Sequence, residues 1–190
     1  IAIEYYLVHS PFAAKLASSM TDGMSWLIVL GLFMGVSYIA NKLAASQTSQ
    51  QMQYLGLALF VVAEAIVFLP LLYIATFYAG EGIIGTAGLM TLLLVGGITA
   101  TVFITKKDFS FMGGFLFAGL MVVIVGAVGA MIAGYFFGVD ISLFSLALSG
   151  AIVLLMSGLI LFDTSRIING GETNYIMATV GLYLNIYNLF

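Results

Sequence analysis

The order of apolar and polar positions divides the chain into long apolar runs joined by short polar connections. A run of about 20 apolar residues can cross a hydrocarbon layer of about 30 Å as an α-helix, because each helical residue adds about 1.5 Å. Six runs approach or exceed that length, at residues 24–41, 54–79, 83–105, 111–136, 142–165 and 174–190. Each is predicted to form a transmembrane helix.

The two ends of the chain suggest a further helix. Residues 1–20 are interpreted as the end of an earlier transmembrane helix and its loop, and the run 174–190 stops within apolar sequence. We therefore expect an internal segment of a longer protein. The predicted fold class is an all-α integral membrane protein, a seven-helix bundle whose first helix is partly missing and whose last is truncated. Because the connections are short, residues 1–190 are expected to form a single transmembrane helical domain.

Composition supports a membrane protein. Hydrophobic residues make up 63% of the chain and charged residues 7%, whereas about a quarter of a typical soluble domain is charged. This apolar content makes the lipid bilayer an expected partner. The net charge of −3 comes from a few scattered groups that form no basic stripe, so nucleic acid is not an expected partner. The chain has no cysteine, and its single histidine, His9, is interpreted as a loop or interfacial residue. No metal and no cofactor are expected.

The basic residues predict the orientation in the membrane. Lys42, the pair Lys106 and Lys107, and Arg166 follow the second, fourth and sixth spans, counting the partial one first. Only Lys15 lies in a loop on the other side. Cytoplasmic loops of membrane proteins carry an excess of Lys and Arg. The loops with these four cations are therefore predicted to be cytoplasmic, as is the N-terminus of the full chain.

Small residues spaced four apart let helix backbones approach closely in a membrane. Two sets show this spacing: Gly31 with Gly35, and the series Gly126, Ala130 and Gly134. Both are predicted to pack tightly within the bundle.

Glu64 is an acidic residue within a predicted span. It lies about ten residues into the span, roughly 15 Å along the helix axis, and Pro70 follows it and can bend the helix. An ionised carboxylate at the bilayer centre costs at least about 2.5–3.5 kcal/mol, so Glu64 should face the protein interior. It is either a protonated residue hydrogen-bonded to another helix or part of a functional site in a water-filled cavity. Solvation or helix capping explains the acids at loops and span ends: Glu4, Asp22, Glu81, Asp108, Asp140 and Glu172.

Asp163 is the second acid within a span. Arg166 follows at i+3 on the same helix face, so the two can form an ion pair at the cytoplasmic end. The helix is predicted to continue to the break at Gly170-Gly171, which leaves Asp163 roughly 7–10 Å inside that end. Gly170 suits a left-handed cap, and Thr173 or Asn174 can cap the next helix. In the resulting hairpin the polar residues that can face Asp163 are Thr179, Tyr183, Asn185 and Asn188.

Catalysis is not expected, and no catalytic residue is proposed. The sequence contains no Ser-His pair, paired aspartates or His-Glu-x-x-His arrangement, and its histidine lies outside the predicted spans.

Two stretches, "TKKDFSFMGGFLFAGLMVVIVG" and "LILFDTSRIINGGETNYIMATVGLYLNIYNLF", resemble the transmembrane Bax inhibitor motif family (Bax inhibitor-1-like), above all its bacterial YccA-like branch. The resemblance covers roughly residues 24–190. It implies a protein of the bacterial inner membrane with one central helix surrounded by six. Some members are pH-sensitive calcium leak channels in which two carboxylates on the last two helices share a proton. The YccA-like branch implies a membrane-anchored AAA protease of the FtsH type as partner.

The resemblance maps the first of these carboxylates to Asp163 and the second to Asn185, which is a departure from the family pattern. An amide cannot share a proton as a second carboxylate would. Asp163 is therefore interpreted as a residue that joins the last two helices through a polar contact, with Asn185 and Arg166 positioning its carboxylate. The leading hypothesis is a non-enzymatic modulator of an FtsH-type protease in membrane protein quality control. The alternative is a calcium or cation leak channel lined by Glu64, Asp163 and Asn185.

Overall fold

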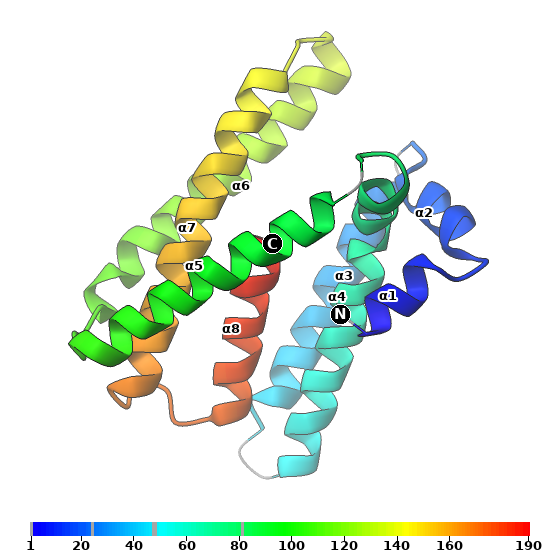
Figure 1. The fold of residues 1–190 in the computed structure, drawn as a ribbon. Helices are drawn as coiled ribbons and strands as arrows, with labels where there is room; N and C mark the ends of the chain where they lie inside the picture. The colour runs from blue at the N-terminus through cyan, green and yellow to red at the C-terminus, as the bar shows by residue number, and fades with distance from the viewer. Residues whose placement is uncertain (1, 24, 47–48, 81) are drawn as a thin grey trace. The chain divides into compact units, whose positions relative to one another are not determined.

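The structure, a computed structural model, describes residues 2–23, 25–46, 49–80 and 82–190. In these residues all regular structure is helical, as the sequence predicts (Figure 1). Glu81 lies outside the described residues, so its predicted loop position is not tested. Two compact units make up the chain, Ile1–Gly88 with Asn174–Val180, and Leu89–Thr173 with Gly181–Phe190. Each unit is described by itself, and the single transmembrane domain stays a prediction.

The first unit centres on a pair of long helices, α3 (Ser25–Ala44) and α4 (Gln50–Phe77). Their backbones approach closely at Gly56, where an added β-carbon would collide with the carbonyl oxygen of Ala40 and the backbone nitrogen of Ala44. Ala40 and Ala44 are both fully buried. Small residues on both helices therefore permit this approach.

The sequence prediction for residues 1–20 was partly wrong. They form two short helices, α1 (Ala2–Val8) and α2 (Ala13–Thr21), and α2 occupies most of the expected loop. Val8 and Ala13 pack with Leu69 of α4 in a small apolar core, which explains why this segment is ordered against α4. Glu4 is buried rather than solvated. His9 is exposed, and its ring lies 4.4 Å from that of Tyr5, with the two planes tilted by 36°.

The second unit contains most of α5 (Ile83–Thr105), a short 3-10 helix η1 (Ser110–Met112), α6 (Gly113–Phe137), α7 (Ser142–Ile168) and part of α8 (Tyr175–Leu189). Its core joins α6, α7 and α8 through Leu116, Leu155, Met156, Ile160 and Leu189. Acidic side chains lie two residues before two of its helical segments. Asp108 accepts a hydrogen bond from the Ser110 backbone N–H at 2.8 Å, and Asp140 accepts one from the Ser142 backbone N–H at 2.9 Å.

Five of the described helices are long and apolar enough to cross a membrane. They correspond to the first five predicted runs: Ser25–Ala44, Gln50–Phe77, Ile83–Thr105, Ser110–Phe137 and Ser142–Ile168. Helix α8 has 15 residues, because the chain before Tyr175 forms the turn that follows α7. The seven-helix bundle therefore stays a prediction, while the all-helical multi-pass class is confirmed.

The two glycine sets behave differently. A β-carbon added at Gly126 would make ordinary van der Waals contact with Leu148 and Phe144, and one added at Gly134 would contact Ile141, which precedes α7. These two positions face neighbouring side chains but do not show an unusually close approach of helix backbones. At Gly31 and Gly35 an added β-carbon would have no neighbour within 4 Å. Within the first unit, Gly31 and Gly35 therefore do not pack tightly as predicted, because α3 contacts α4 through Ala40 and Ala44 instead.

Candidate functional site

The turn between α7 and α8 positions the candidate site in the second unit. Helix α7 continues to Ile168, so Asp163 lies five residues, or about 7.5 Å, before its end. Gly170 follows in the left-handed region at φ +77°, as its place after the helix predicts. Asn174 caps α8, because its Oδ1 accepts hydrogen bonds from the backbone N–H groups of Ile176 (3.0 Å) and Met177 (3.1 Å).

Asp163 and Asn185 are joined by a hydrogen bond. Asn185 Nδ2 donates to Asp163 Oδ2 at 2.7 Å, and Asn185 is only 8% exposed. Two other polar candidates bond within α8 instead: Thr179 donates to the Tyr175 carbonyl, and Asn188 donates to the Leu184 carbonyl. Asn185 is therefore the predicted candidate on α8 that the structure shows hydrogen-bonded to Asp163.

Gly181 leaves room for the Asp163 carboxylate against α8. It precedes Asn185 by four residues and so lies on the same helix face. A β-carbon at Gly181 would lie 3.3 Å from Asp163 Oδ2. The carboxylate thus rests against backbone at Gly181 and accepts an amide N–H from Asn185.

This pairing determines what the site can do chemically. A neutral amide donates to an ionised carboxylate but carries no charge and does not titrate. Two carboxylates at this distance would repel and share a proton, whereas an aspartate and an asparagine do not. The arrangement is therefore an amide-to-carboxyl hydrogen bond between two helices, which is charge-assisted when Asp163 is ionised.

Arg166 interacts electrostatically with Asp163, but its close contacts among the described residues lie in the turn after α7. Its Nη2 lies 3.8 Å from Glu172 Oε2 and donates to the Gly171 carbonyl at 3.1 Å. Its guanidinium also lies 5.5 Å from the centre of the Phe162 ring. The turn at Gly170-Gly171 brings Glu172 and a free carbonyl toward the arginine, which therefore stabilises the turn.

Glu64 belongs to the first unit and is placed only within it. It lies in the middle of α4, 14 residues after Gln50 and 13 before Phe77. Gly56, Phe60 and Glu64 recur at four-residue spacing on one face of the helix, and all three are buried. Glu64, at 6% exposure, thus faces the interior, as its charge requires in a membrane. Its place in an ion pathway stays untested.

Ser165 is a structural residue that the sequence reasoning missed. It is fully buried, accepts a hydrogen bond from the Phe109 backbone N–H at 2.8 Å, and donates to the Lys107 carbonyl at 3.2 Å. It thereby fastens the loop before η1 to α7. The sequence does not indicate this role, because Ser165 lies in the polar stretch "DTSR". Such a stretch is typical of a solvated helix end, where a buried serine is not expected.

The site offers no evident metal cage. In the described part of the chain, no group of three or more His, Cys, Asp or Glu side chains could hold a metal ion.

Comparisons with known proteins place the chain among its relatives. The family described as "Inhibitor of apoptosis-promoting Bax1" (Bax1-I) matches residues 2–190. A "Modulator of FtsH protease YccA" of Escherichia coli is 50% identical over 92 residues, which cover 48% of this chain and 39% of that protein. An "Uncharacterized membrane protein" of Vibrio cholerae is 48% identical over 118 residues, or 60% of this chain and 50% of the relative.

A Pasteurella multocida relative is 33% identical over 166 residues, which cover 85% of this chain and 69% of that protein. The match to the Vibrio and Escherichia proteins spans about half of their length or less. No solved structure matches the chain significantly.

Proposed function

Because this chain belongs to the Bax inhibitor-1 family, we propose that it binds and modulates a membrane-anchored, ATP-dependent protease of the FtsH type in the bacterial inner membrane. The observation that carries the proposal is the 50% identity to a protein named a modulator of FtsH protease. The five long apolar helices agree with it, since a partner in the same bilayer can meet them along their whole length. The role proposed is regulatory and not catalytic.

The Asp163–Asn185 pair supports this choice over the alternative, a pH-sensitive calcium or cation leak. A sensor built from two carboxylates needs like charges that compete for a proton. Here the position opposite Asp163 carries an amide that donates to it at 2.7 Å. The role we propose for the pair is to hold α8 against α7 in a form that the protease can recognise.

Co-purification tests the proposal directly. The tagged full-length protein, extracted in mild detergent from membranes at native abundance, should bring a membrane AAA protease with it. An unrelated polytopic membrane protein, tagged and expressed at the same level, serves as the control. Equal recovery of the protease with both baits would contradict the proposal.

A further inference from the structure

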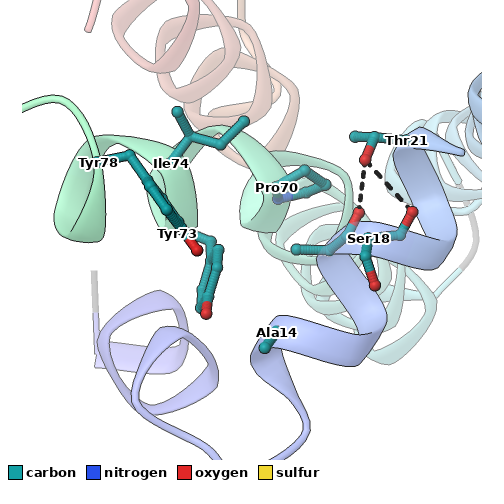
Figure 2. A pocket seen from close by; sticks show the side chains of 8 residues that line it. Ala14, Ser18, Thr21, Pro70, Tyr73, Ile74 and Tyr78 are labelled. Carbon is teal, nitrogen blue, oxygen red and sulfur yellow. Dashed lines mark hydrogen bonds between the residues drawn. The ribbon is translucent and has the colours of Figure 1, made fainter.

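A pocket of about 230 Å³ lies in the first unit, between α2 and the last turns of α4. Figure 2 shows Tyr73 and Tyr78 on the α4 side and Ser18 and Thr21 on the α2 side, with Pro70 between them. Proline occurs here inside a helix, where its ring and missing N–H prevent regular packing of the turn. The remaining lining residues are Ala14, Ala17 and Ile74.

The hydroxyl groups of the pocket present acceptors. Ser18 donates its proton to the Lys15 carbonyl at 3.0 Å, and Thr21 donates to the Ala17 carbonyl at 3.0 Å. Their protons are thus committed within α2, and each oxygen retains lone pairs for a ligand. The two sides of the pocket therefore offer hydroxyl oxygens and aromatic rings.

The aromatic side suits a cation. The rings of Tyr73 and Tyr78 have centroids 6.2 Å apart and planes inclined at 53°. Aromatic faces attract ammonium groups, and paired rings recognise them in several kinds of site. The eight described lining residues include no charged side chain, because Lys15 and Asp22 lie outside the lining. An anion would thus find no basic group there.

The depth of the pocket indicates where the cation comes from. Helix α4 has 28 residues and is about 42 Å long, whereas the hydrocarbon layer is about 30 Å thick. The pocket is formed by the last turns of α4 and by Tyr78, which caps its end. If α4 is centred in the bilayer, about 6 Å of it extends beyond the hydrocarbon layer at each end, so the last turn of α4 and Tyr78 lie at the level of lipid headgroups and Pro70 lies deeper.

From these observations we propose that the pocket binds the ammonium group of a phosphatidylethanolamine headgroup. The rings of Tyr73 and Tyr78 attract its charge, and the hydroxyl oxygens of Ser18 and Thr21 accept its N–H groups. A phosphatidylcholine headgroup carries the same charge but has no N–H to donate. The pocket should therefore prefer phosphatidylethanolamine to phosphatidylcholine, and both to phosphatidylglycerol.

Native mass spectrometry of the full-length protein tests this preference. The protein is purified from nanodiscs that contain the three lipids in equal amounts, and the retained lipid is identified. Tyr78→Leu should lower retention of phosphatidylethanolamine about 3- to 10-fold, because the ring contact is lost. Tyr78 is 75% exposed, so this change leaves the apolar core intact. Tyr135→Leu, at an equally exposed tyrosine near the end of α6, is the matched control and should retain the lipid.

A second variant separates the hydroxyl acceptors from the rings. The double change Ser18→Ala and Thr21→Val should abolish the preference for phosphatidylethanolamine over phosphatidylcholine while preserving the preference of both over phosphatidylglycerol. Equal retention of all three lipids by the unchanged protein would overturn the proposal, as would equal loss in the Tyr78 and Tyr135 variants. Thermal stabilisation of delipidated protein by free ethanolamine, without any preference among the lipids, would overturn the assignment to a lipid.

Discussion

Asp163 accepts a hydrogen bond from the side-chain amide of Asn185. We expect the identity of residue 185 to determine how the contact between α7 and α8 responds to pH. In the variant Asn185→Asp, a second carboxylate would face that of Asp163, at the position where Asn185 Nδ2 now donates to Asp163 Oδ2 at 2.7 Å. They cannot both ionise without strong repulsion, so the variant should bind a shared proton at low pH and lose it as the pH rises. Its thermal stability should therefore fall between about pH 6 and 8, whereas that of the native protein stays nearly constant.

Asn188→Asp provides the matched control for this change. Asn188 is exposed and bonds within α8, so an acid there should produce no comparable pH dependence. Unfolding temperatures of all three proteins in nanodiscs, measured across the same pH range, give the comparison. A steep response in the native protein that Asp163→Asn abolishes would show that the native site already titrates, and the leak-channel hypothesis would then gain support.

Asp108 and Asp140, which precede two helical segments of the second unit, should stabilise the fold at neutral pH and lose this contribution at acidic pH. Hydrogen bonds from the Ser110 side chain and backbone lower the pKa of Asp108, and those from the Ser142 backbone and side chain lower the pKa of Asp140. A lowered pKa stabilises the fold above the unfolded value of about 3.9, and this stabilisation disappears as the pH falls through the folded value. The double variant Asp108→Asn and Asp140→Asn should be less stable than the native protein at pH 6.

Thermal unfolding as a function of pH checks this expectation. The difference in unfolding temperature between the native protein and the double variant should shrink below about pH 4, where the native carboxyl groups become protonated. A difference that stays constant down to pH 3 would show that the charge of these two aspartates contributes nothing.

At the scale of elements, the contact between α3 and α4 depends on the missing side chain of Gly56. Gly56→Ala should destabilise the protein by about 1–3 kcal/mol or more, because the new methyl group would collide with backbone atoms that cannot rotate away. Gly35→Ala is the control, since nothing lies within 4 Å of the position that its methyl group would occupy. That change should be neutral or stabilise α3 by up to about 1 kcal/mol, as alanine favours the helix.

Urea or thermal unfolding in mild detergent measures both effects. Equal stability of the two variants would contradict the close approach of α3 to α4 at Gly56.

Elements and sites differ in how far the sequence predicts them. The long helices follow from apolar runs. Counting residues on both sides of the glycine turn leaves four polar candidates for the partner of Asp163, and only the family resemblance singles out Asn185, which the structure shows bonded to it. The glycines at helix contacts cannot be predicted in this way. Gly31 and Gly56 both lie in apolar helical sequence, and only the tertiary structure determines which of them faces a neighbouring helix. Likewise, the spacing of Arg166 favours Asp163, but the turn brings Glu172 to the arginine.

At the scale of the whole molecule, the predicted topology places Lys42, Lys106-Lys107 and Arg166 in the cytoplasm. Single cysteines report the side of each loop clearly, because the chain has none of its own. Lys107→Cys should resist an impermeant thiol reagent added to intact cells, and Asp140→Cys should react with it. Both native side chains are exposed, so protection must come from the membrane and not from burial. Labelling at position 107 from outside would reverse the proposed orientation.

Protease activity in a reconstituted bilayer tests the central claim most directly. An FtsH-type protease and one of its membrane substrates are placed in proteoliposomes with increasing amounts of the full-length protein, and the half-life of the substrate is measured in the presence of ATP. An unrelated polytopic protein at the same molar ratio is the control. We expect the half-life to lengthen with the amount of the Bax inhibitor-1 family member and to stay unchanged with the control. A half-life that does not change over the whole range would contradict the proposed role as a protease modulator.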